Sequence, residues 1–337
     1  MTLLHLEPGA LSRCRFGLSP LAETVGSLMA LHRPCSDPWL QAWHTTHQAA
    51  YRTWIDQDPV AAGLLPLLAA TKWLPDLVAI PPTGGMSTRL IDELAAVAAH
   101  DDHRVRATVT DAVDASWGPQ TTTWLRLDRL GPRVATVIEH GWDRFVAPDW
   151  PRRRAVLERD VMHRAGLLAT YGWEHAVQDL TNALSWAGPD TLRFGHQAWA
   201  DRHIGAEGLV FVPRTTGGGS WTCEQPPRLA LVYPARGPAA PAHSPCSDPL
   251  AELLGAGRAR IVRELTQPAT SSQLAAALTL SLGTVSAHLT VLRDADIATG
   301  ARAGRHVIYR LTARGTELVQ LLGGRTAPGD TRSVGDL

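Results

Sequence analysis

The sequence has few cysteines and no long apolar run. Its four cysteines stand far apart, without a CxxC pair: Cys14, Cys35, Cys223 and Cys246. This spacing predicts reduced, mostly structural thiols rather than disulfides or a zinc knot. The apolar stretch VAAGLLPLLAA, residues 60–70, is shorter than the roughly 18 residues that a membrane span needs. We therefore expect no membrane partner.

Catalytic motifs are missing as well. The sequence contains no GxSxG elbow, no phosphate loop and no compelling pair of acidic residues. The glycine-rich stretch TTGGGSW, residues 215–221, is followed by neither a lysine nor a helical pattern, so it predicts a turn between strands. The stretch MTLLHLEPGALSR has no basic region ahead of its apolar patch, unlike a signal peptide. We expect a cytoplasmic protein that is not an enzyme and needs no cofactor.

Charge and tryptophan are unevenly distributed along the chain. The net charge is zero, but residues 249–325 contain nine arginines against five acidic residues, and residues 1–248 contain 22 basic and 25 acidic residues. All twelve tryptophans lie between Trp39 and Trp221. Two regions of different chemistry are therefore joined, and positive charge is concentrated in the C-terminal one.

The join between them is visible as YPARGPAAPAHSPCSDP, residues 233–249, where Pro, Ala, Gly and Ser replace any periodic pattern. We place the boundary near residue 245. The predicted organisation is an effector-sensing and dimerisation domain over 1–245, a DNA-binding domain over 246–325 and a flexible tail over 326–337.

The amino-terminal region is expected to be helical to about residue 182. In GLSPLAETVGSLMALHRP, Ser19 is placed to cap a helix that begins with Pro20. In PDWPRRRAVLERDVMHRAGLLATYG, residues 157, 161, 165 and 168 form an apolar stripe, with Arg and Glu on the other side. The hairpin ALSWAGPDTLRFG and the runs GLVFVP and RLALVYP then predict a small, mainly antiparallel sheet over 183–235.

Residues 280–312, LSLGTVSAHLTVLRDADIATGARAGRHVIYRLT, contain a helical pattern followed by a hairpin pattern. Ser281 is placed to cap a helix of about three turns, in which Val285, Leu289 and Leu292 form a buried stripe. The opposite side carries small or hydrogen-bonding residues, which allow close approach to another molecule: Gly283, Thr284, Ala287 and Thr290, flanked by Ser286 and His288.

The neighbouring segments complete a larger motif. PATSSQLAAALT predicts a short helix that starts near Ser271 or Ser272, only about three residues before the capped helix, which is a helix-turn-helix pattern. Downstream, residues 297–302 and 306–311 flank the turn AGR, whose Gly304 suits a hairpin tip.

TVSAHLTVLRDADI followed by RAGRHVIYRLT resembles the winged helix of bacterial ArsR-type transcriptional regulators, over roughly residues 250–322. The resemblance implies an α+β protein with a C-terminal winged helix-turn-helix, acting as a homodimeric repressor on a pseudo-palindromic double-stranded DNA operator. The long amino-terminal region resembles that of extended regulators of this family, whose chemistry is unassigned.

DNA contacts are expected from the two helices and from the wing. The helices should read bases in the major groove, and the wing should contact phosphates or the minor groove. The candidate DNA-binding residues are Ser272, Ser281, Gly283, Thr284, Ser286, Ala287, His288, Arg302, Arg305 and His306.

The same resemblance indicates where a metal site would lie. Many ArsR-type proteins bind metal through cysteines on the helix before the recognition helix, or through Asp and His on the last helix. Here those places read SSQLAAALT and ARGTELVQLLGG, without Cys or His, so we expect no such site. The remaining ligand spacing is His44 with His47, or the cluster HDDH at residues 100–103, which zinc could use.

The tryptophan excess favours a pocket for a small, aromatic effector in the amino-terminal region, although any single Trp is better assigned to the core. Two alternatives remain. The amino-terminal region could be an enzyme with a fused DNA-binding module, or its Trp-rich surface could bind a protein partner.

Overall fold

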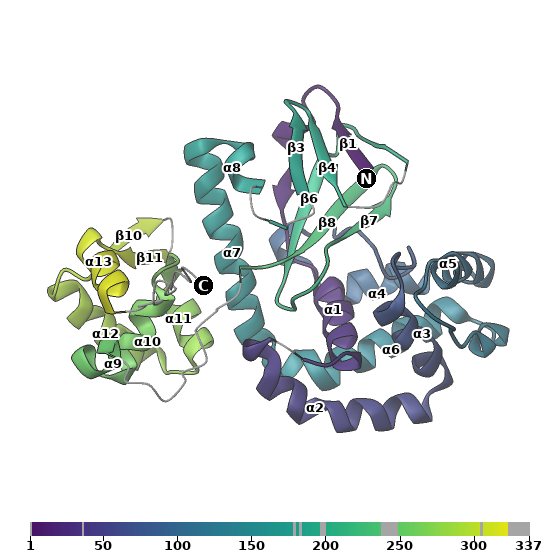
Figure 1. Cartoon of the computed structure of the whole chain (residues 1–337), viewed down its shortest axis with the longest axis horizontal. Helices are drawn as coiled ribbons and strands as arrows, with labels where there is room; N and C mark the ends of the chain where they lie inside the picture. Colours follow the sequence, from purple (N-terminus) through teal and green to yellow (C-terminus); the bar gives the residue numbers. More distant parts are fainter. Residues whose placement is uncertain are drawn as a thin grey trace, which may run out of the picture. The chain divides into compact units, whose positions relative to one another are not determined.

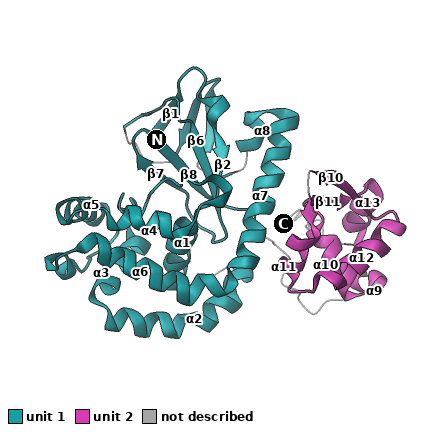
Figure 2. Ribbon diagram, turned by 180° about the vertical axis from the view of Figure 1, so that it is seen from behind, with its two compact units in different colours: residues 1–242 teal, residues 243–337 magenta. Residues whose placement is uncertain are grey.

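A computed structural model describes residues 2–35, 37–177, 180–181, 184–195, 200–236, 249–303 and 306–322. The chain divides into two compact units, Met1–Ala242 and His243–Leu337 (Figure 2). The predicted boundary near residue 245 and the predicted tail over 326–337 both lie outside the described residues.

The first unit contains a helical body whose helices begin at the expected local signals. Ser19 caps the first helix by accepting a hydrogen bond from the Ala22 N–H at 2.9 Å, which confirms the predicted start at Pro20. Asp37 and Asp58 cap the next two in the same way. The helices are α1 (Pro20–His32), α2 (Pro38–Gln57), α3 (Pro59–Ala70), α4 (Leu90–Ala98), α5 (Asp102–Asp114), α6 (Leu130–Gly141), α7 (Trp150–Tyr171) and α8 (Trp173–Val177).

Two four-stranded sheets complete the first unit (Figure 1). One has the order β3-β4-β1-β5, from Leu184–Gly188, Thr191–Phe194, Thr2–Leu6 and Arg202–Ile204. The other has the order β2-β6-β8-β7, from Arg15–Phe16, Leu209–Arg214, Arg228–Pro234 and Trp221–Gln225. The predicted hairpin is β3-β4, and the predicted runs GLVFVP and RLALVYP are β6 and β8.

The α+β class is confirmed, but the sheet differs from the expectation in two respects. Both sheets are mixed, because β1 pairs parallel with β5, and β6 pairs parallel with both β2 and β8. In addition, β1 and β2 come from the first residues of the chain, before the helical body. Leu4 on β1 faces Leu192 on β4, and a pairing so distant in the sequence leaves no local signal.

The buried face of α7 also differs from the expectation. Leu157 and Val161 are buried as predicted, but Ala165 is exposed, and Arg153 and Arg164 are buried. A helical pattern predicts that arginine faces solvent, because the partners that allow it to be buried cannot be read from the helix itself. Arg153 meets Glu23 of α1, for example.

The described part of the second unit consists of five helices and a small sheet. Its elements are α9 (Pro249–Leu254), α10 (Ala256–Glu264), β9 (Ala269–Thr270), α11 (Ser271–Leu278), α12 (Leu282–Asp294), β10 (Ala298–Ala303), β11 (His306–Leu311) and α13 (Ala313–Leu322). The sheet order is β10-β11-β9. Val285, Leu289 and Leu292 are buried, which confirms the predicted stripe of α12.

Within the described residues, no single helix is long and apolar enough to cross a membrane. Only α11 and α12 together pass that test of length and composition, as a pair bent by 116°. A bend of this size is typical of the two helices of a helix-turn-helix.

Candidate functional sites

The helix-turn-helix of the second unit is built by two N-terminal caps. Thr270 and Gln273 form a capping box at α11: the Thr270 hydroxyl accepts from the Gln273 N–H, and the Gln273 side chain accepts from the Thr270 N–H. Ser281 caps α12 by accepting from the Thr284 N–H at 3.1 Å. Between them, Thr279 adopts a left-handed backbone with φ 56°. These local interactions set the angle between the two helices.

The exposed side of α12 presents small and hydroxyl side chains near its start. Gly283, Thr284, Ser286 and Ala287 are all exposed, and no acidic residue lies among them. The Thr284 hydroxyl lies 2.8 Å from the Ser281 hydroxyl, so both belong to the cap as well as to the exposed side. Leu282 and Val291 add apolar surface, with exposed fractions of 53% and 46%. This side of α12 can approach a DNA groove without repulsion from a carboxylate.

Two predicted DNA-binding residues lie away from the centre of that side. His288 is half-buried and packs against α10, since a Cβ at Gly257 would lie 2.9 Å from His288 Nε2. Ser272 is exposed in the first turn of α11. The described arrangement therefore groups residues 283–287 together, with His288 at the seam between two helices.

The wing is the hairpin of β10 and β11. Arg302 faces Val307, and Ala303 faces His306 in the antiparallel register. Because side chains alternate between the faces of a strand, Arg302 and His306 lie on opposite faces of the wing. Both are exposed, and Arg302 has no hydrogen bond or ion pair with another described residue. The predicted tip residues, Gly304 and Arg305, lie outside the described residues.

The first unit contains a buried polar network that the sequence analysis missed. Arg153 Nη1 donates to Glu23 Oε1 at 2.6 Å and to the Ser27 hydroxyl at 3.0 Å. The Thr215 N–H donates to Glu23 Oε2 at 2.8 Å, and its hydroxyl donates to Glu23 Oε1. Glu23 and Arg153 are both 0% exposed. The network thus ties α1 and α7 to the start of the loop that follows β6.

That loop is the glycine-rich stretch 215–221, and Arg214 organises it. The Arg214 guanidinium is buried and donates to the carbonyls of Thr216, Gly217 and Gly219. Its charge lies 4.8 Å from the centre of the Trp221 ring. Burial lowers the pKa of Arg214 to about 10, so it remains protonated at neutral pH. The predicted connection between strands is confirmed, with an arginine at its centre.

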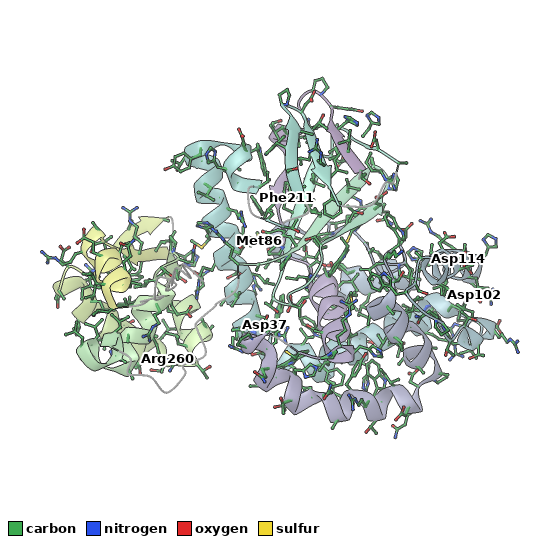
Figure 3. The ribbon with its side chains drawn as sticks, viewed as in Figure 1. Asp37, Met86, Asp102, Asp114, Phe211 and Arg260 are labelled. Carbon is green, nitrogen blue, oxygen red and sulfur yellow. The ribbon has the colours of Figure 1, made fainter. Side chains whose placement is uncertain are left out.

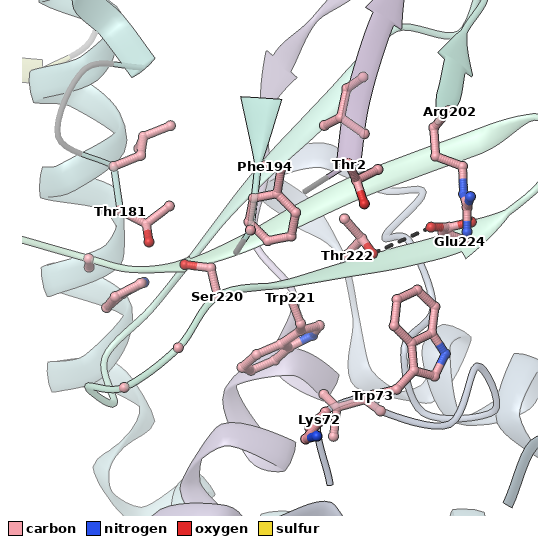
Figure 4. A pocket seen from close by; sticks show the side chains of 18 of the residues that line it. Thr2, Lys72, Trp73, Thr181, Phe194, Arg202, Ser220, Trp221, Thr222 and Glu224 are labelled. Atoms are coloured by element: carbon pink, nitrogen blue, oxygen red, sulfur yellow. Dashed lines mark hydrogen bonds and ion pairs between the residues drawn. The ribbon is translucent and has the colours of Figure 1, made fainter. Parts of the chain in front are cut away.

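A cavity of about 680 Å³ lies in the first unit, between the two sheets and the 72–74 segment (Figure 4). Its size falls in the range of pockets for drug-sized ligands. Phe194 and Trp221 both line it, above and below Ser220 in this view, and Trp73 lies on the side of Arg202 and Glu224 (Figure 4). Its wall also includes Pro234, Ala235 and Arg236, the last described residues before residue 249.

Tryptophan is otherwise mainly a packing residue. Trp43, Trp54 and Trp124 are buried in the helical body, and others pack against the apolar clusters of the first unit. Trp117 is 62% exposed. Trp73 and Trp221 line the cavity. Most of the described tryptophans therefore pack in the interior, and only Trp73 and Trp221 line the cavity.

Three of the alternative metal ligands, His44, Asp101 and Asp102, have structural roles. His44 is buried with Nε2 at 2.9 Å from the Arg33 carbonyl oxygen. Asp101 caps α5, and Asp102 accepts from the N–H groups of Arg129 and Leu130 (Figure 3). Across the described residues, no group of three His, Cys, Asp or Glu side chains is arranged to hold a metal ion.

Capped helices at a sharp angle, an exposed α12 and a flanking hairpin define a winged helix-turn-helix. A family model described as a helix-turn-helix domain matches residues 258–300, from α10 to β10. No curated protein and no solved structure matches the chain. The second unit is therefore a DNA-binding domain, and the protein is a DNA-binding transcriptional regulator.

Proposed function

We propose that the protein is an effector-responsive repressor of the ArsR type. It binds a pseudo-palindromic operator as a homodimer, with one α12 in each of two major grooves and half-site centres about 34 Å apart. It acts in the cytoplasm, where it meets the DNA that it regulates. A small molecule bound to the first unit releases the operator.

The exposed side of α12 is the observation that carries this proposal. Gly283 and Ala287 let the helix lie close to the base edges, and Thr284 and Ser286 supply hydroxyls. Because this side has few polar groups, contact with thymine methyls should contribute as much as hydrogen bonds. The exposed Arg302 and His306, with Arg305 between the two wing strands in sequence, supply phosphate contacts that weaken with salt.

The cavity supports an effector site in the first unit. It is large enough for a small organic molecule, and aromatic side chains line it. A ligand there changes DNA affinity only if it binds the two states of the regulator unequally.

Selection of binding sequences from a random pool of duplex DNA by the full-length protein tests the proposal. We expect one enriched palindromic sequence, bound by a dimer in analytical ultracentrifugation. A lack of enrichment, or binding by a monomer to a site without symmetry, would contradict it.

The enzyme alternative makes a different prediction. After release of DNA, a sensor returns its ligand unchanged, whereas an enzyme returns a product. Mass spectrometry of small molecules that co-purify with the protein, before and after prolonged incubation, separates the two.

A further inference from the structure

The shape of the cavity favours a flat ligand. Phe194 projects from the end of β4 and Trp221 from the start of β7, and in this view they lie above and below Ser220 (Figure 4). Both side chains are half-buried, so each retains an accessible ring surface. Aromatic groups stack favourably on such rings, with ring centres about 4.5–7 Å apart in typical pairs. Because both rings line the same cavity, a fused aromatic ligand there can stack on them.

The charge of the cavity wall favours an acid. Three cationic residues line it, Lys72, Arg202 and Arg236, against one acidic residue, Glu224. Glu224 is already paired, because Arg202 Nε donates to its Oε2 at 2.8 Å. The wall therefore carries excess positive charge, and a ligand with a negative charge would complement it.

Arg236 is the cation best placed to receive that charge. Its guanidinium Nη1 lies 2.9 Å from His163 Nε2, an imidazole rather than a carboxylate. Burial, followed by the charge of Arg236, lowers the pKa of His163, so the imidazole is neutral at neutral pH. The nearby Asp160 is buried and already bonded to the Tyr233 hydroxyl and to the Arg236 N–H. The guanidinium itself remains exposed.

We propose that the cavity binds a planar aromatic carboxylate, with its rings stacked on Phe194 and Trp221 and its carboxylate on the Arg236 guanidinium. This inference rests on the proposed function, since it names the chemical class of the effector. A carboxylate makes a stronger, charge-assisted hydrogen bond to arginine than an imidazole does. The ligand therefore draws the guanidinium away from His163.

The position of Arg236 links this contact to DNA binding. Its backbone N–H is bonded to Asp160 of α7 at 3.0 Å, and the Ala235 N–H is bonded to the Arg214 carbonyl at 2.8 Å. These bonds hold the chain at the point where residues 237–248 lead to the second unit. A ligand that engages Arg236 acts directly on that point of attachment.

Binding of anthracene-2-carboxylate to the full-length protein, followed by the fluorescence of the probe, tests the ligand class. Anthracene-2-carboxamide is a neutral molecule of the same shape and serves as its counterpart. We expect the carboxylate to bind about tenfold or more tightly than the carboxamide, the effect of one charge-assisted hydrogen bond. Equal affinities, or no binding of either probe, would overturn the proposal.

Two substitutions locate the contact. Arg236→Gln should weaken the carboxylate about tenfold and leave the carboxamide unchanged, whereas Arg126→Gln, at an exposed arginine that does not line the cavity, should change neither. Phe194→Leu should weaken both probes alike. If the preference for the carboxylate survived Arg236→Gln but disappeared in Lys72→Met, the assignment to Arg236 would be wrong.

A final measurement distinguishes a failure of this inference from a failure of the proposed function. Saturating anthracene-2-carboxylate should lower the affinity of the wild type for its selected DNA, and should change that of Arg236→Gln much less. If the protein binds the carboxylate selectively but selects no DNA, the proposed function fails and the ligand class stands. If it selects DNA but does not distinguish the two probes, the ligand class fails alone.

Discussion

The two units place their charged side chains differently. In the first unit, Glu23, Arg153, Arg164 and Arg214 are buried. Glu23 and Arg153 are bonded to each other from distant segments, and the two other arginines donate to carbonyls nearer in the chain. In the second unit, no charged side chain among the described residues is buried. The arginines of the second unit therefore stay out of its core, which consists mainly of apolar side chains. The first unit uses charges to join its layers, which makes its structure sensitive to the removal of one partner.

The largest effect is expected when the second unit is expressed without the first. Residues 246–325 expressed alone should retain weak operator binding but lose the whole response to effector, because the cavity belongs to the other unit. Gel-shift titrations of the fragment and the full-length protein, each with and without effector, measure this. A fragment that still released DNA on effector addition would place the sensor in the winged helix.

Glu23→Ala should destabilise the first unit by about 3–5 kcal/mol, because it removes the buried carboxylate beside Arg153 and leaves only the less buried Asp149, at 3.3 Å. Urea unfolding followed by tryptophan fluorescence reports on this unit alone, since every Trp lies between residues 39 and 221. Glu207→Ala, at an exposed position, is the matched control and should cost less than about 0.5 kcal/mol. Similar losses of stability in both variants would show that the buried network is not what holds the layers.

Glu93 makes the stability of the first unit depend on pH. It accepts hydrogen bonds from the Ser19 hydroxyl and the Leu21 N–H, yet burial raises its pKa from 4.5 to about 7. The folded state therefore holds this proton more tightly than the unfolded state does. The contribution is fully present below pH 4.5 and is lost as pH rises through about 7.

Relative to Glu93→Gln, the wild type should thus lose roughly 3 kcal/mol of unfolding free energy between about pH 4.5 and pH 8. Urea midpoints of both proteins across this range measure the difference. A constant difference would mean that Glu93 does not titrate with a raised pKa.

Replacing both Thr284 and Ser286 with Ala should reduce the preference for operator over random DNA by about 1–3 kcal/mol for each base that these hydroxyls recognise. Competition binding at one salt concentration measures the preference. Thr316→Ala, at an exposed hydroxyl on α13, is the control and should leave it unchanged. An unaltered preference in the double variant would show that α12 reads DNA with another face.

The smallest effect concerns the wing. Arg302→Ala should weaken binding to all DNA sequences alike and reduce the slope of log affinity against log salt by about one unit, the effect of removing one phosphate contact. Arg305→Ala is expected to do the same. Arg314→Ala, which removes an arginine paired with Asp296 at 3.6 Å, should leave the slope unchanged. The same slope in all variants would exclude the wing from DNA contact.

The second unit could be predicted well because its signals are local. The Ser281 cap, the stripe of Val285, Leu289 and Leu292 and the wing strands all occur where their sequence patterns indicate. The packing of His288 against Gly257 was not predictable, because that contact joins two helices. The DNA contacts themselves remain predictions.

The first unit could be predicted only in part. The Ser19 cap and the β3-β4 hairpin follow from neighbouring residues and are confirmed. The placement of β1 beside β4 and the burial of Arg153 depend on residues far apart in the chain. The bonds of Arg214 to the loop after it are local, but arginine is ordinarily expected at the surface. No local sequence pattern indicates which distant segments pair. For the same reason, a cavity could be expected in this unit, but its position between those segments could not be predicted.

The place of β1 in its sheet has a consequence during synthesis of the protein. This strand, at residues 2–6, is flanked by β4 and β5, which end at residues 194 and 204. Until the ribosome has made residue 194, neither neighbour of β1 is complete, and β5 is complete only at residue 204. The first unit must therefore finish folding late, when translation has almost reached the DNA-binding unit. The elements of the second unit are close together in the sequence, so its folding does not depend on a strand made much earlier.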